Sequence, residues 1–275
     1  MLATYHTHSY FCDGAMHPED YVRAAIDKGF TAIGFTSHAP VLFETDWTMK
    51  LSLLNDYIET ILHLKEKYKN RIQVYAGLET DYYTNSPDYR GMPGLDYTIG
   101  AVHFLYSKTK QRYMALDGTP EEFLETLNTI FSGDVEAMIK AYYSLYAEML
   151  RKRPPDIAGH IDVLKKNNKD DCFFSEKSQW YRLAVEAALN EIKKQGIIVE
   201  VNTGGISRGY TTEVYPSVWI MKIMREMGIP IVLNSDAHHP DWIDAYYEKA
   251  LNMIKSAGYT TQRVLIDGVW QDVKL

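Results

Sequence analysis

Six of the nine histidines in this 275-residue chain lie at or just after the ends of predicted β-strands, and carboxylates follow the same strands. The residues at these strand ends are His6, His8, Asp13, His38, Glu79, His103, His160, Asp236 and His238. In a parallel α/β barrel the carboxyl ends of all strands face one cleft, so we expect these side chains to gather there. Imidazole and carboxylate together suit zinc, manganese or iron. The pattern therefore predicts a centre with several metal ions, typical of metal-assisted hydrolysis.

Strands and helices alternate along the chain, which favours a parallel sheet covered by helices. The predicted barrel strands are residues 2–8, 32–36, 72–78, 97–102, 156–158, 197–201 and 229–233. The predicted helices cover about 18–28, 52–68, 120–131, 135–151, 178–195, 216–228 and 243–256. Residues 108–118 are interpreted as an excursion outside the core, and Asp267-Gly268 predicts the turn of a C-terminal hairpin. Because no linker or repeat interrupts the alternation, we expect residues 1–275 to form a single domain.

Composition argues against several classes of protein. The 29 basic and 36 acidic residues give a net charge of −7, and no Lys/Arg stripe indicates nucleic-acid binding. An anionic substrate stays compatible with this charge, because bound metal ions would be the largest local charges. No apolar run is long enough to span a membrane, and the start MLATYHTHSYF lacks the regions of a signal peptide. Two cysteines without a C-x-x-C pair fit a reducing cytoplasm, where we expect the protein. The sequence leaves its oligomeric state open.

Two short motifs carry paired ligands. His6-Thr7-His8 lies on a strand, where residues i and i+2 point the same way, so both rings can reach one ion. Asp13-Gly14 follows on a tight turn that can fold back over the same edge. Asp236-Ala237-His238 follows an apolar strand and again places two candidate ligands at positions i and i+2. The alternative for Asp236 is a helix cap.

The other four candidates follow single strands. Glu79 ends the apolar run 74–78, and its two oxygens could bridge two cations; the alternative is an ion pair at the barrel rim. Taken singly, His38, His103 and His160 are as often hydrogen-bonded core histidines as ligands. Their common place at one edge, beside two other motifs, favours metal binding.

Substrate contacts are predicted from four further residues. Arg208 follows a Gly pair after Asn202, and a guanidinium suits bidentate phosphate recognition, although a surface arginine in a flexible loop is an equal alternative. Asp81, which shares the orientation of Glu79, and Glu44 could each pair with a cationic amine of the substrate. The sequence lacks G-x-S-x-G, G-x-x-x-x-G-K-[ST] and G-x-G-x-x-G after a strand, which argues against a serine nucleophile, a P-loop and a dinucleotide site.

The motifs occur in a familiar order. H-T-H-S…D-G, T-S-H-A-P, G-L-E-T-D, V-H-F, G-H-I-D, E-V-N-T-G-G…R…E-V-Y-P-S and S-D-A-H span residues 5–240. This series resembles the PHP (polymerase and histidinol phosphatase) superfamily, most closely its histidinol-phosphatase branch. The resemblance implies a distorted (β/α)7 TIM-like barrel with a trinuclear site of zinc, iron or manganese. The implied ligand sets are His6, His8, Glu79 and Asp236 for one ion, Glu79, His103 and His160 for a second, and Asp13, His38 and His238 for the third.

The resemblance also implies an activity, the hydrolysis of L-histidinol phosphate to histidinol and phosphate in histidine biosynthesis. A metal-bridging hydroxide would attack phosphorus, with Glu79, Asp236 and Arg208 as the catalytic residues. Alternatives are a PHP phosphoesterase for another small phosphorylated metabolite and a non-catalytic metal-binding barrel. A nuclease, as among polymerase-associated members, is disfavoured by the missing basic stripe. Residues 104–118 depart from the family pattern close to the site and could change the substrate, and some relatives have histidine at or beside Asp13.

Overall fold

Seven parallel strands form the centre of the computed structural model, which describes residues 1–275. In sheet order they are β1 (Ala3–Thr4), β2 (Ala32–Phe35), β3 (Gln73–Asp81), β4 (Tyr97–Ala101), β7 (Ile157–Ala158), β8 (Ile198–Asn202) and β9 (Ile231–Asn234). The first and last strands come together where His8 N donates to the Ala237 carbonyl at 2.9 Å and Tyr5 N donates to Asn234 Oδ1 at 2.8 Å. The sheet is therefore a nearly closed barrel, and the predicted (β/α)7 fold is confirmed.

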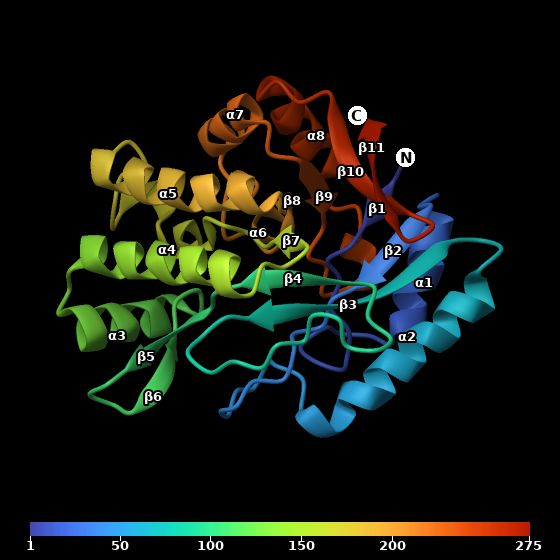
Figure 1. Cartoon of the computed structure of the whole chain (residues 1–275), viewed down its shortest axis with the longest axis horizontal. Coiled ribbons are helices and arrows are strands. Elements are labelled where there is room, and N and C mark those ends of the chain that lie inside the picture. The colour runs from blue at the N-terminus through green and yellow to red at the C-terminus, as the bar shows by residue number, and fades with distance from the viewer.

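Helices cover the outside of this barrel (Figure 1). They are α1 (Pro18–Asp27), α2 (Leu54–Tyr68), α3 (Pro120–Phe131), α4 (Val135–Lys152), α5 (Gln179–Gln195), the short α6 (Gly204–Ser207), α7 (Val218–Met227) and α8 (Tyr247–Ser256). Fully buried side chains such as Phe35, Tyr57 and Ile192 fill the layer between strands and helices, and each contributes about 1.5–3 kcal/mol on burial. Figure 1 shows α4 between α5 and α3.

Local sequence signals fix the helix ends. Thr119 and Glu122 form a reciprocal capping box at the start of α3, whose first residue is Pro120. The helix α5 ends at Gly196, which adopts a left-handed conformation with φ 70°. These two signals explain why the predicted helices 120–131 and 178–195 agree with the structure to within one residue.

A C-terminal hairpin of β10 (Thr261–Ile266) and β11 (Val269–Lys274) lies against the amino end of the barrel. Tyr5 links the two parts, because its hydroxyl accepts from Leu265 N at 2.9 Å and donates to Leu265 O at 3.1 Å. Val264 and Leu265 join a separate buried cluster with the inward side chains of the strands. The Asp267-Gly268 turn was predicted from sequence and is confirmed. This end of the barrel is filled, and the open end lies at the carboxyl ends of the strands.

Three segments differ from the prediction. The strand expected over residues 2–8 is continuous only over Ala3–Thr4, because the Asn234 side chain accepts the next backbone hydrogen bond, and pairing resumes as a single bridge between residues 7 and 237. The third strand continues to Asp81, so Glu79 lies inside it rather than at its end. The excursion expected over residues 108–118 holds only the turn and the second strand of an antiparallel hairpin, formed by β5 (Phe104–Ser107) and β6 (Arg112–Ala115).

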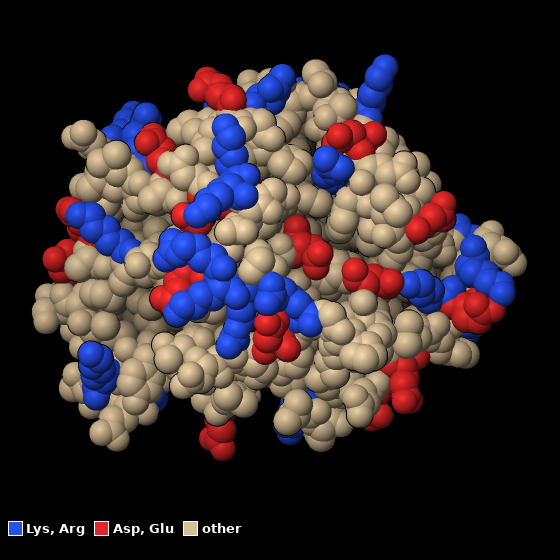
Figure 2. Space-filling model, viewed as in Figure 1, with Lys and Arg blue, Asp and Glu red and all other residues tan.

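The surface carries charges of both signs (Figure 2). In the last turn of α4, Arg151 and Lys152 pair with Glu191 and Glu148 at 4.0 and 2.7 Å, so neighbouring carboxylates balance these basic groups. None of the helices is long and apolar enough to cross a membrane.

Candidate metal centre

His6 and His8, just after β1, face the same two carboxylates. His6 Nε2 lies 3.2 Å from Glu79 Oε2, and His8 Nε2 lies 3.1 Å from Asp236 Oδ1. The crossed distances are 3.6 Å from His6 Nε2 to Asp236 Oδ1 and 3.5 Å from His8 Nε2 to Glu79 Oε2. Two imidazole nitrogens and two carboxylates thus surround one point, as they do in divalent-ion sites.

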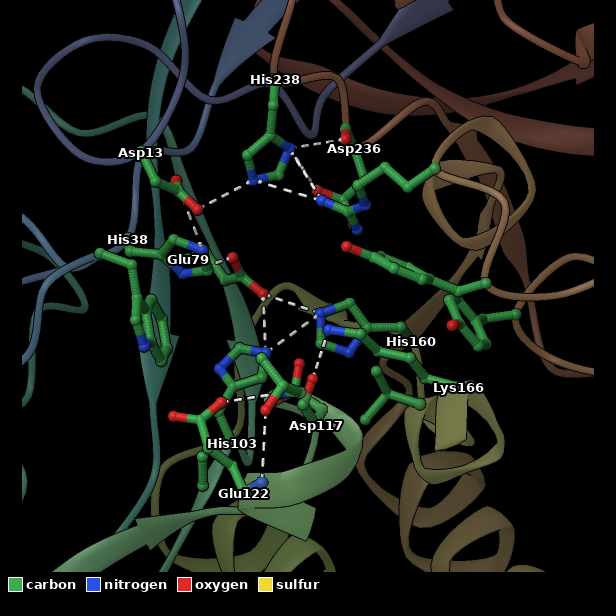
Figure 3. Close-up of a pocket in the computed structure, with 18 residues that line it drawn as sticks. Asp13, His38, Glu79, His103, Asp117, Glu122, His160, Lys166, Asp236 and His238 are labelled. Carbon is green, nitrogen blue, oxygen red and sulfur yellow. Dashed lines mark hydrogen bonds and ion pairs between the residues drawn. The ribbon is translucent and has the colours of Figure 1, made fainter. Parts of the chain in front are cut away.

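Glu79 faces two separate groups of histidines (Figure 3). Its Oε2 lies 2.8 Å from His38 Nδ1, on the side of His6 and His8. Its Oε1 lies 2.8 Å from His160 Nε2 and 3.5 Å from His103 Nε2. The backbone sets this arrangement, because residue 38 forms a parallel bridge with residue 79 of β3. A carboxylate in this position can bridge two cations.

Asp13 completes a third group at the outer side of the cluster. His238 Nε2 lies 3.2 Å from Asp13 Oδ2, and His8 Nδ1 and His38 Nε2 lie 3.6 and 3.9 Å from its Oδ1. The turn that carries Asp13 passes close to the strand end, since a Cβ on Gly14 would lie 2.4 Å from the backbone of His8. Only glycine fits this approach. The Asp13 side chain is 32% exposed, so this group faces solvent more than the other two do.

The donor atoms of the cluster fit divalent cations. His6 Nε2, His8 Nε2, His38 Nδ1 and Glu79 Oε2 are buried and lack a hydrogen-bond partner, although they lie close to one another. Buried polar atoms are otherwise almost always paired, and an ion is a common reason for an exception. Three of the combinations whose ligand atoms lie within 4.8 Å of one another are His6–His8–Glu79, Glu79–His103–His160 and His8–Asp13–His38–His238. The structure thus brings together all nine residues predicted as ligands.

Charge and burial keep Glu79 and His8 in the forms that bind a metal ion. Burial alone would raise the pKa of Glu79, but the charges of His38 and His6 hold that pKa well below its ordinary value. Burial, together with repulsion from His238, lowers the pKa of His8 to about 3. An ionised carboxylate and a neutral imidazole are the forms that bind a metal ion.

Two carboxylates behind the cluster orient its histidines. Glu200 Oε2 lies 2.8 Å from His6 Nδ1, and Glu200 Oε1 accepts from the backbone N of His160 at 2.8 Å. Asp81 Oδ1 lies 2.8 Å from His103 Nδ1. Such partners fix the ring orientation and the tautomer of a ligating histidine.

Arg208 lies at the edge of the cluster, directly after α6. Its Nη2 donates to Asp236 Oδ2 at 2.9 Å, and its Nη1 lies 2.9 Å from His238 Nδ1. The guanidinium also lines a cleft of about 380 Å³ above the cluster, whose far wall carries Asp117, Glu122 and Lys166 (Figure 3). A cluster of donors at the base of a cleft, with cations beside it, can bind a small anionic molecule.

Comparison with known proteins agrees with this geometry. A protein-family model described as the PHP domain matches residues 4–204. A histidinol-phosphatase of Bacillus subtilis is 31% identical over 265 residues, which cover 90% of this chain and 97% of that protein. The chain belongs to the PHP domain family.

Two solved structures share its fold. The HisK protein of Listeria monocytogenes superposes with a TM-score of 0.77 at 22% identity, over 90% of this chain and 99% of that one. The histidinol phosphate phosphatase of Lactococcus lactis, solved with zinc, L-histidinol and phosphate, has a TM-score of 0.72 at 20% identity, over 98% of both chains. The predicted resemblance to PHP proteins and the predicted barrel are thereby confirmed.

Three of the four predicted substrate contacts do not line the cleft of this PHP protein. The Asp81 carboxylate is directed at His103, and Asn202 is fully buried with its amide bonded to Glu200, Asp236 and Gly204 N. Glu44 is exposed in the loop before α2. Of the four, only Arg208 borders the cleft.

Sequence reasoning missed two kinds of residue in this PHP site. Glu200 lies in the middle of an apolar strand, and a buried charge there needs a partner, so its position alone was a usable signal. The second kind consists of cleft residues whose position depends on how α3 and the loop after β7 pack. These residues are Asp117, Glu122 and Lys166, and the sequence pattern does not predict that packing.

Proposed function

We propose that this protein is a metal-dependent phosphomonoesterase that hydrolyses L-histidinol phosphate to histidinol and phosphate. The observation that carries the proposal is the cluster around Glu79, whose two oxygens face separate histidine groups at the base of a cleft bordered by Arg208. Similarity to the Bacillus subtilis histidinol-phosphatase over nearly the full length of both chains supports the substrate. We also propose a cytoplasmic location and a role in histidine biosynthesis.

Three divalent ions, zinc, iron or manganese, would complete the site. The proposed sets are His6, His8, Glu79 and Asp236; Glu79, His103 and His160; and Asp13, His38 and His238. Ions held by these residues would supply positive charge to bind phosphate and would lower the pKa of a bound water. Three ions (+6) and the three ligand carboxylates of Asp13, Glu79 and Asp236 (−3) would give the set of ions and ligands a net charge of about +3, which favours an anionic substrate although the whole chain is acidic.

The chain's own side chains bind and orient the substrate. Arg208 is held by Asp236 and His238 at the cluster, so its charge lies where the phosphate group would bind. On the opposite wall, Asp117 and Glu122 present carboxylates to the cleft. A cationic amino alcohol attached to the phosphate would find complementary charge on that wall.

Phosphate release tests the proposal directly. Protein loaded with Mn, Zn or Fe is compared on L-histidinol phosphate and on a generic aryl phosphate. We expect a kcat/KM of about 10⁴ M⁻¹s⁻¹ or more on L-histidinol phosphate, well above that on the aryl ester. Equal, slow turnover of both esters would contradict the substrate but keep the phosphatase. Absence of turnover with any of the metals would contradict the activity itself.

A further inference from the structure

Tyr215 is a buried side chain of the cleft that has no role in the site described so far. It lies in the loop between α6 and α7, where residue 215 pairs with residue 202 across an antiparallel bridge at the end of β8. The side chain borders the same cleft as Arg208, and only 2% of the residue is exposed. The tyrosine therefore reaches the site from a loop, held by the backbone of a barrel strand.

The ring of Tyr215 is fixed from several sides. Lys165 Nζ lies 5.2 Å from its centroid, and the ring of His160 lies 6.4 Å away. On a third side the backbone of Gly205 approaches closely, since a Cβ there would lie 2.7 Å from the ring. A larger residue at 205 would displace the tyrosine. The hydroxyl thus occupies a defined position.

That hydroxyl has no hydrogen-bond partner in the protein. Other buried tyrosines of the barrel differ, since Tyr146 donates to the Gly159 carbonyl and Tyr259 to the Ile229 carbonyl, both at 2.8 Å. A buried hydroxyl without a partner is unfavourable, and such groups in folded proteins usually meet a ligand, an ion or a water. The cleft is the space that Tyr215 borders, so a molecule bound there can supply the missing partner.

The neighbouring groups indicate an acceptor. Arg208 Nε, on the same side of the cleft, is also buried without a partner, and it can only donate. Burial raises the pKa of the Tyr215 hydroxyl far above its ordinary value although the charge of Arg208 opposes this, so the hydroxyl keeps its proton. Two unpartnered donors beside one cluster of metal ligands fit an oxyanion.

We propose that the Tyr215 hydroxyl, beside Arg208, donates a hydrogen bond to a phosphate oxygen of the bound substrate. This inference rests on the proposed function for the identity of the substrate. The bond helps to orient the phosphate group over the cluster of ligands, and phosphate released by hydrolysis keeps it until it leaves.

The variant Tyr215→Phe tests this role, because it removes only the hydroxyl. Tyr259→Phe is the matched control, since it removes a buried tyrosine hydroxyl that is hydrogen-bonded away from the cleft. For both variants and the wild type, loaded with the same metal and checked for metal content, three quantities are measured. They are the affinity for inorganic phosphate, the melting temperature without phosphate, and kcat/KM on L-histidinol phosphate.

We expect opposite results for the two variants. Tyr215→Phe should weaken phosphate binding by about 10-fold or more while its melting temperature stays equal or rises, because the lost hydroxyl had no partner in the protein. Tyr259→Phe should lower the melting temperature by about 2–6 °C and leave phosphate affinity unchanged. Wild-type phosphate affinity in Tyr215→Phe overturns the inference.

The design separates this inference from the proposed function. A wild-type protein that binds phosphate but does not hydrolyse L-histidinol phosphate contradicts the proposed substrate, while the difference between wild type and Tyr215→Phe still decides the role of Tyr215. A wild-type protein that binds no phosphate with any metal overturns both.

Discussion

Glu79 presents its two carboxylate oxygens to different histidine groups, so loss of its charge should weaken metal binding in both groups. Glu79→Gln keeps the size of the side chain but removes its charge and one anionic oxygen. We expect metal content to fall by at least one ion per chain and activity to fall more than about 100-fold. This loss is larger than the loss expected when a residue that only hydrogen-bonds to a metal ligand is removed. Metal analysis and phosphate release measure this. The control Glu66→Gln, on a 74% exposed side chain, should change neither.

Glu200 acts on the centre through other residues, because it contacts His6 and the backbone of His160. Glu200→Gln should lower metal affinity about 10- to 100-fold, since the ring of His6 loses the anion that orients it. Competition with a chelator measures the affinity, and circular dichroism checks that the fold persists. If metal affinity equals that of the wild type, Glu200 does not position the ligands.

The segment that joins β6 to α3 brings Asp117 into the cleft. Lys166 Nζ donates to the Asp117 carbonyl and ties this segment to the loop after β7. We predict that Asp117→Asn raises KM for L-histidinol phosphate about 3- to 10-fold, because a partly screened attraction to the substrate's cation is lost, while kcat/KM on an aryl phosphate stays within two-fold. Equal losses on both substrates would show that Asp117 does not recognise the cation.

The elements differ in how far sequence could predict them. Strands such as β3 and β9 are apolar runs between turn signals, since they are buried on both faces. They could be predicted closely enough to bring Glu79 and Asp236 to the same edge, although β3 extends past Glu79 to Asp81. The end of β1 could not be predicted from the sequence. There Tyr5 N donates to the side chain of Asn234 in β9, 229 residues away in the sequence, instead of to a backbone carbonyl of a neighbouring strand. Tyr215 likewise owes its place to a single bridge within a loop, which has no periodic signal.

The protonation state of the centre affects the stability of the whole fold. Burial disfavours a charged His103, but the adjacent Asp81 raises its pKa to about 10. The ordinary pKa in an unfolded chain is about 6.5. Protonated His103 therefore stabilises the metal-free fold fully below pH 6.5, and this contribution is lost as the pH rises through about 10. His8, with its pKa lowered to about 3, stays neutral throughout this window.

Metal ions act in the opposite direction, because they bind the neutral ring and so displace the proton from His103. We therefore predict that the melting temperature of the metal-free protein falls between pH 6.5 and 9.5, whereas the increase produced by a fixed concentration of Mn²⁺ grows over the same range. Thermal melts at constant ionic strength, with and without Mn²⁺, measure both trends. In His103→Gln, which lacks the titrating ring, both slopes should be shallower. A metal-induced increase that is independent of pH would show that protons and metal ions do not compete for this centre.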